Sequence, residues 1–479
     1  MLMRLAGYFR PAPARHGKDD RPGAALIFSR RERGLLLAAF TLLVMFRLPH
    51  AWIHGRFLDE EATVFLAYAW HRPALDALLR PFGGYLNLAA NGTTMFVAML
   101  AKNGILPLER APYLTMIAAL FVQVQPAVLI LTGRAPWLSS RLAVIAALLV
   151  IAIAPATEEL FFNVLHIQFH LALCVALILA LDPPRRRIAR IGHGLILFLA
   201  PLCGPGAIIV LPLFLLRALV DRDVRRLAQM APLAAGAAIQ MGLFYGSSPM
   251  RGLFPDPAAV AATLSVRLIA LPLAGAGIAN DVGNAIIRAL RSPGSIDWWP
   301  AAIVAVLAFG TLLRRAARQR NGAIWLLLSG LAIAMATFTF GVVTLDKTAL
   351  FNVHAGERYN FLPMVLIAHA LIAMAADPRA SGRRAHAALC AVMLIVGAVQ
   401  YTNPLAAFRD GPSWPDEVAA WRRDHDHPLA VWPRPWTADL SDRSPACSPV
   451  DRDNPVWSDD PRYCESGWVS GFIPRPPSR

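Results

Sequence analysis

The sequence predicts an all-α polytopic membrane protein with about eleven transmembrane helices, short helices at the outer membrane surface and a small C-terminal tail. Of its 479 residues, 56% are hydrophobic and only 16% are charged, against about 25% charged in an average soluble domain. The apolar residues form runs long enough to cross a bilayer, which takes about 20 residues. This composition excludes a soluble multidomain enzyme, a disordered chain and a fibrous protein.

The positive charge does not indicate a nucleic-acid partner. The formal net charge is +15 at pH 7, but the arginines lie in short clusters between apolar runs, without interleaved aromatic residues. This is the placement expected of cytoplasmic loops. Arg far outnumbers Lys and Ala is abundant, as in bacteria with GC-rich genomes. We therefore expect a bacterial inner (plasma) membrane protein whose partner is the lipid bilayer and not nucleic acid.

The N-terminal segment, 1–33, is polar and basic and is expected to be cytoplasmic. No small-residue cleavage site follows the first apolar run, so we expect no cleavable signal peptide. The first crossing, 34–48, leads outwards to a loop with the acidic run Asp59-Glu60-Glu61.

The run 82–101 is predicted not to cross the membrane. Polar residues such as Asn87 and Asn91 interrupt it, and Gly83, Gly84 and Gly92 weaken it as a helix. Only if it stays at the outer surface do the later basic loops fall inside and the acidic loops outside.

The segment 191–217 lies between two basic loops and therefore needs an even number of crossings. Pro201, Gly204 and Pro205 stand at its middle, so we predict two short helices that meet near Gly204. Broken helices of this kind occur within the protein or beside a water-filled cavity.

The remaining apolar runs complete a transmembrane domain over 34–402, with the N-terminus inside and the C-terminus outside. A weaker run, 259–279, is placed in a long outer region. The predicted crossings are 34–48, 112–132, 141–155, 167–181, the two helices of 191–217, 227–245, 299–313, 322–344, 359–376 and 386–402.

The tail, 403–479, differs in composition and is rich in Pro, Trp, Asp and Arg. Its predicted location is the oxidising periplasm, where Cys447 and Cys464 could form a disulfide. Its tryptophans either fold a small cap or line a sugar site, or they pack the tail on the membrane surface.

The ionisable residues that suggest chemistry gather on the outer side. Three consecutive carboxylates, Asp59-Glu60-Glu61, could supply a general base or metal ligands. Close like charges raise the pKa of at least one of them, which suits a base. The alternative is a solvated acidic loop that helps to set the topology.

Two later outer loops carry further candidates. His166 and His170 stand four residues apart, with Asn163 before them, and either hold a metal or line the mouth of a cavity. Arg358 and Lys347 could bind a phosphate at the membrane surface, or Arg358 is a plain interfacial anchor. Gly83-Gly84-Tyr85 forms either a turn or a close backbone approach to a ligand.

The arrangement of a short first crossing, an outer loop with an acidic pair and juxtamembrane helices resembles the GT-C class of membrane glycosyltransferases. Shorter segments, Pro81 to Leu88, Asn163 to His170, Leu202 to Pro205 and Glu357 to Tyr359, look like those of bacterial members of this class. The chain lacks a clear Asp-x-Asp in its second outer loop, so the resemblance leaves dependence on a divalent metal open. It also lacks a large soluble domain like that of oligosaccharyltransferases, which argues against peptide glycosylation.

The resemblance implies roles for several residues. Asp59, and next Glu60, would be the base or acceptor-orienting group, with Glu158, Glu159, Asn163 and His166 assisting. Arg358 would bind a lipid phosphate. The implied function is transfer of a sugar from a polyprenyl-phosphate donor to a periplasmic glycan or lipid acceptor. A transporter or flippase of a lipid-linked glycan precursor, and a polymerase or ligase of such glycans, are the alternatives.

Overall fold

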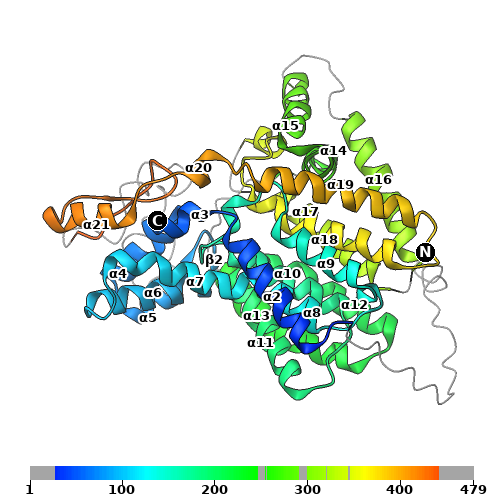
Figure 1. The fold of residues 1–479 in the computed structure, drawn as a ribbon, viewed down its shortest axis with the longest axis horizontal. Helices are drawn as coiled ribbons and strands as arrows, with labels where there is room; N and C mark the ends of the chain where they lie inside the picture. The colour runs from blue at the N-terminus through cyan, green and yellow to red at the C-terminus, as the bar shows by residue number, and fades with distance from the viewer. Residues whose placement is uncertain are drawn as a thin grey trace, which may run out of the picture.

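The computed structural model of the protein describes residues 27–245, 254, 256–290, 299–319, 321–342 and 346–441. In this part of the chain the fold is almost entirely helical, with two short β-hairpins (Figure 1). The two N-terminal helices precede the acidic run and are α2 (Arg30–Met45) and α3 (Pro49–His54).

The elements from the acidic run to the first long helices form a compact group of short segments. They are η1 (Glu61–Leu66), α4 (Ala67–His71), α5 (Ala74–Leu79), β1 (Pro81–Phe82), β2 (Tyr85–Leu86), α6 (Leu88–Lys102) and η2 (Leu108–Arg110). The helices that follow, up to the middle of the chain, are α7 (Ala111–Gln123), α8 (Gln125–Thr132), η3 (Pro136–Leu138), α9 (Arg141–Ala152), η4 (Glu158–Leu160), α10 (Ile167–Ala180), α11 (Arg187–Cys203), η5 (Pro205–Val210), α12 (Leu211–Asp221) and α13 (Val224–Tyr245).

The second half continues with long helices and ends in a small mixed segment. Its helices are α14 (Pro257–Ser265), η6 (Val266–Ala270), α15 (Leu271–Leu290), α16 (Trp299–Ala317), α17 (Ala323–Ala336), η7 (Thr337–Gly341), η8 (Lys347–Phe351), α18 (Arg358–Ala376), α19 (Arg383–Tyr401), α20 (Ala406–Arg409) and α21 (Trp414–Arg423). The antiparallel strands β3 (Leu429–Ala430) and β4 (Thr437–Ala438) close it.

Six helical stretches among the described residues are long and apolar enough to span a bilayer, so the chain is a multi-pass membrane protein. Five of them coincide with predicted crossings: Leu108–Thr132, Trp299–Ala317, Ala323–Gly341, Arg358–Ala376 and Arg383–Tyr401. Two predicted crossings form shorter apolar helices, Arg141–Ala152 and Ile167–Ala180. The total of eleven crossings and the orientation of the termini stay predictions.

The sixth stretch, Pro257–Leu290, covers the run 259–279 that the sequence analysis leaves outside the membrane. It is 34 residues long, and its most apolar window of 18 residues has a mean hydropathy of 1.7, so its length and composition permit a crossing. The run looks weak in the sequence because small and polar residues follow it. In the structure the helix continues through them, with one break in helical geometry at Gly275 (φ +87°).

The run 82–101 begins with a hairpin and continues as a helix of 15 residues. Gly83 and Gly84 have φ of +60° and +86°, the left-handed conformation that a two-residue hairpin turn requires. The predicted turn is confirmed. The helix α6 is not among the candidate spans; it packs on η1, α4 and α5.

The predicted break within 191–217 is confirmed. Helix α11 ends at Cys203, Gly204 adopts an extended conformation, and a 3₁₀ turn leads into α12. A Cβ atom on Gly204 would meet the side-chain oxygen of Gln168 at 1.8 Å. Glycine therefore lets the broken segment approach the start of α10 closely.

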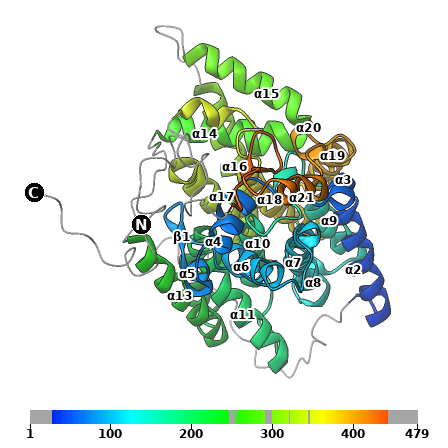
Figure 2. The same ribbon diagram turned by 90° about the vertical axis from the view of Figure 1, so that its left-hand side faces the viewer.

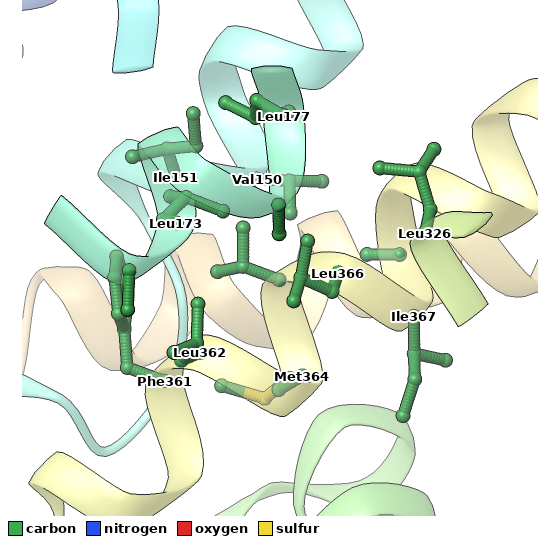
Figure 3. Packing of buried hydrophobic residues seen from close by; sticks show 14 of the residues in the cluster. Val150, Ile151, Leu173, Leu177, Leu326, Phe361, Leu362, Met364, Leu366 and Ile367 are labelled. Atoms are coloured by element: carbon green, nitrogen blue, oxygen red, sulfur yellow. The ribbon is translucent and has the colours of Figure 1, made fainter. Parts of the chain in front are cut away.

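Helices α10 and α18 form the centre of the bundle (Figure 2). In α18, 89% of the most apolar window is buried, against 22% in α16 and α19. Helix α10 is apolar on all sides and almost fully buried, as expected for a central helix. Side chains of α9, α10, α17 and α18, including Ile151, Leu173, Leu326 and Leu366, interlock there (Figure 3).

A separate, smaller core joins the acidic-run region to the C-terminal tail. Residues of η1 and α4 pack with Trp414 and Val418 of α21 and with Leu429 of β3, and Figure 1 shows α21 near α4, away from α14–α16. The indole N–H of Trp414 donates to the carbonyl of Leu108 (2.8 Å). The described part of the tail, 403–441, folds on this region as a small cap; its contact with a sugar or with the membrane surface stays a prediction.

The cap is also joined to the acidic run through the backbone. The amide of Asp59 donates to the carbonyl of Trp432 (2.6 Å), and the amide of Trp432 donates to that of Phe57 (3.1 Å). The Trp432 side chain is 1% exposed, and its ring lies 5.7 Å from the Arg56 guanidinium. The cap therefore fixes the backbone on which Asp59 stands.

We predict that Trp432→Ala lowers the free energy of unfolding by about 3–5 kcal/mol, the usual cost of truncating a buried aromatic side chain. Hydrogen exchange at residues 57–61 should speed up more than in the central helices α10 and α18. Trp299→Ala is the matched control, because Trp299 is 52% exposed and its loss should cost less than about 1 kcal/mol. Equal destabilisation by both variants contradicts the prediction.

Candidate functional site

Three loops that are far apart in the sequence meet at one place. They are the acidic run after α3, the loop 157–166 between α9 and α10, and the loop before α18. Glu61 accepts a hydrogen bond from the amide of Val164 (2.9 Å), and Glu159 accepts one from the amide of Arg358 (3.0 Å). The three outer loops of the predicted topology therefore form one cluster of charged residues.

The three consecutive carboxylates have different surroundings. Glu61 is fully buried, and its two oxygens accept from the backbone amides of Leu58 (3.1 Å) and Val164. It thus ties two loops together. Glu60 lines a cavity of about 390 Å³. Asp59 is half-buried and has φ +45°, a left-handed conformation that Asp adopts more readily than most residues.

The Asp59 carboxyl lies among other charges. Burial raises its pKa well above the usual range, and Glu60 and Glu159 raise it further, while Arg358 and Arg56 oppose this. A raised pKa makes the Asp59 carboxylate a stronger base than an exposed aspartate.

Glu159 and Arg358 form an ion pair at the centre of the cluster. The Arg358 guanidinium donates to Glu159 Oε1, and it lies 4.9 Å from the Tyr359 ring. Burial disfavours the charged form of Glu159, but Arg358 and His166 outweigh it and lower the pKa. The Arg358 side chain is 26% exposed, and it lines the same cavity as Glu60.

The two histidines have different positions. His166 directly precedes α10, its Nδ1 lies 3.1 Å from the carbonyl of Glu159, and burial lowers its pKa to about 4. It is therefore neutral at pH 7. His170 is fully buried between Phe161 and Phe361, and neither of its ring nitrogens has a hydrogen-bond partner among the described residues. Of the two, His166 alone lines the cavity.

Glu158 and Asn163 support the loop. Glu158 pairs with Arg47 (2.9 Å), whose guanidinium also donates to the carbonyls of Ala152 and Ala154 (both 2.7 Å). The Asn163 amide donates to the carbonyls of Glu159 and Phe161 at 2.9 and 3.1 Å. Both side chains are buried, and they hold the shape of the loop that presents Glu159.

Three predicted residues lie outside what the structure describes. Lys347 starts η8, but its side chain is beyond the described part. Cys447 and Cys464 both lie in 442–479, outside the described residues. Tyr85 is placed: its hydroxyl accepts from Gln168 (3.0 Å), and it lines the cavity.

The cavity has a volume of about 390 Å³ and joins this cluster to the apolar interior of the bundle. Its polar lining consists of Glu60, Tyr85, His166, Gln168, Gln240, Thr337 and Arg358. Its apolar lining includes Phe169, Ile208, Ile209, Met241, Ile333, Phe340 and Leu362. Met241 and Phe340 are 50% and 53% exposed, so the apolar end reaches the outer surface of the helices. Asp59 is not among the lining residues.

No family model matches the chain, and comparisons with curated proteins and with solved structures find no match.

In the part of the chain that the structure describes, no group of three or more His, Cys, Asp or Glu side chains is placed to hold a metal ion. His166 Nε2 lies 3.8 Å from Glu159 Oε1. The described residues therefore do not decide the dependence on a divalent metal that the sequence leaves open.

Sequence reasoning missed the buried arginines. Arg47, Arg56 and Arg267 are each at most 1% exposed, and each donates to backbone carbonyls of the loops that build the site. A single arginine inside or at the end of an apolar run is costly in a membrane and marks a buried partner. That signal was present in the sequence at Arg47 and Arg267.

Glu61 gives a pH-dependent contribution to stability. Burial raises its pKa to about 7 from an ordinary 4.5, so the folded state binds its proton more tightly than the unfolded state. The contribution is fully present below pH 4.5 and is lost as the pH rises to about 7, with a size on the order of 3 kcal/mol. We predict that Glu61→Gln removes this dependence. Unfolding midpoints at pH 5 and 8 test it, and an unchanged pH difference in the variant contradicts it.

Proposed function

We propose that the protein is a membrane glycosyltransferase that moves a sugar from a polyprenyl-phosphate donor to a glycan or lipid acceptor on the outer face. The observation that supports this is the cavity itself. It combines the charged side chains Glu60 and Arg358 with a lining that is mostly apolar and reaches the helix surface. A ligand that fits has a charged head and a long apolar tail.

The cationic end suits the phosphate of such a donor. A guanidinium offers five N–H donors in a planar fork, and only part of the Arg358 group is engaged by Glu159. In the transfer, the acceptor oxygen forms a bond to the anomeric carbon and the bond from that carbon to the phosphate oxygen breaks. Arg358 stabilises the negative charge that develops on the departing polyprenyl phosphate.

The carboxylate at the same end suits the acceptor. Glu60 lines the cavity, so it takes the proton of the acceptor hydroxyl as that oxygen attacks. Asp59 stands next to it with a raised pKa and is the second candidate for this step. Among the residues proposed as base, contact with the cavity favours Glu60 over Asp59.

The test measures release of polyprenyl phosphate from labelled polyprenyl-phosphate hexose and pentose donors in proteoliposomes. We predict that Arg358→Ala lowers turnover about 10²–10³-fold, the usual loss when a group that stabilises developing charge is removed. Arg358→Lys should restore part of it. Asp410→Asn, a carboxylate in the exposed Arg409–Asp410 pair, should leave turnover unchanged.

Two results would overturn the proposal. One is full turnover in Arg358→Ala with a donor that the wild type uses. The other is movement of the labelled lipid across the bilayer with no release of sugar from any donor, which would favour the flippase instead. Both are read in the same vesicles.

A further inference from the structure

A second cavity lies at the far end of the bundle from Arg358. It has a volume of about 1090 Å³ and is formed by the end of α16, the loop between α18 and α19, and the loop between α8 and α9. Helix α18 runs from Arg358 to Ala376, and its 19 residues span roughly 28 Å. This matches the hydrocarbon thickness of a bilayer, about 30 Å, so the two cavities lie at opposite membrane surfaces.

The second cavity is strongly basic. Arg314, Arg315, Arg318 and Arg379 line it, and Asp377 is the one acidic residue in its described lining. Asp377 uses its carboxylate to accept from the backbone amide of Arg379 (2.9 Å). Among the described residues, the guanidinium groups of Arg314, Arg318 and Arg379 form no ion pair. The orientation of a membrane protein requires basic residues in its cytoplasmic loops, but it does not require four of them to line one cavity.

An apolar strip leads into the cavity along α16. Ile303, Leu307, Thr311 and Arg315 follow one another at intervals of four residues, so each is next to the following one and together they form a continuous row on the helix surface. Ile303 and Leu307 are 53% and 65% exposed, while Thr311 and Arg315 line the cavity. This row of side chains thus changes from apolar to cationic along the helix, as a phospholipid changes from acyl chain to phosphate.

We propose that this cavity binds the headgroup of an anionic phospholipid, with an acyl chain along Ile303 and Leu307. The phosphate is held by Arg314, Arg318 and Arg379. The apolar strip on α16 favours a lipid over a free phosphate, because a free phosphate has no acyl chain to pack against it. This binding site is independent of the proposed transferase function and of its cavity.

The experiment titrates the purified full-length protein in detergent with cardiolipin, phosphatidylglycerol, phosphatidylcholine or soluble glycerol phosphate, and follows the unfolding midpoint. The wild type should be stabilised by the two anionic lipids and not by the other two. The triple variant Arg314→Gln, Arg318→Gln, Arg379→Gln should lose at least tenfold in apparent affinity. Arg185→Gln, Arg186→Gln, Arg187→Gln removes as many arginines outside this lining and should change it less than twofold.

A second variant tests the cavity without removing charge. Ser139 lies in the lining and is exposed, so Ser139→Trp should fill the hollow and weaken lipid binding while all arginines remain. Equal losses in the two triple variants would overturn the proposal, because any basic surface would then suffice. Stabilisation by glycerol phosphate as strong as by the lipids would also overturn it, since the site would then recognise phosphate alone.

Discussion

Glu60→Gln is expected to lower the turnover of the proposed transferase about 10²–10⁴-fold, the range for loss of a general base. The variant keeps the size of the side chain and removes its ability to take a proton. Because Glu60 lines the cavity and Arg358 lies at the same end, the loss should fall on kcat and leave donor KM nearly unchanged. Steady-state release of polyprenyl phosphate, with donor and acceptor varied separately, gives both values.

The matched variant for this prediction is Asp59→Asn. Asp59 is adjacent in sequence but does not line the cavity, and its pKa is raised by burial and by its acidic neighbours. We expect a smaller loss, through the position of Glu60. A full loss in Asp59→Asn with near-normal turnover in Glu60→Gln would transfer the role of base to Asp59. Normal turnover in both variants would refute a carboxylate base in this loop.

Arg267→Met is expected to destabilise the protein by about 3 kcal/mol or more, through loss of a buried hydrogen-bond network. The Arg267 guanidinium donates to the carbonyls of Ala349, Leu350, Asn352 and Ala355 at 2.5–3.0 Å. It also donates to Asn360 Oδ1 (2.8 Å). Methionine fills similar space and leaves these five acceptors without their donor.

The damage should be concentrated near the site, because these acceptors lie in the loop before Arg358 and in the first turn of α18. Hydrogen exchange should increase in residues 349–360, together with a lower unfolding midpoint. Arg288→Met is the control, since Arg288 lies near the far end of the same helical stretch and is exposed. A midpoint for Arg267→Met within 1 °C of the wild type would contradict the assigned role.

The sequence alone determined the class of the protein and the general position of the site. Low charge content and long apolar runs are local properties, so they predict a multi-pass membrane protein without any tertiary information. The hairpin turn at Gly83-Gly84 and the break at Gly204 follow equally from the backbone preferences of Gly and Pro. The gathering of acids, histidines and Arg358 in alternate loops followed from the order of the crossings.

Tertiary structure decided what each of those residues does. Among three consecutive carboxylates, Glu61 binds two backbone amides and Glu60 faces the cavity, a distinction that depends on loops a hundred residues away. Likewise Arg358 pairs with Glu159, and the backbone of Asp59 is held by a hydrogen bond to Trp432 of the C-terminal cap. The physical reason is that hydrogen bonds and burial between distant segments follow no sequence period, whereas membrane spans and turns are fixed by neighbouring residues.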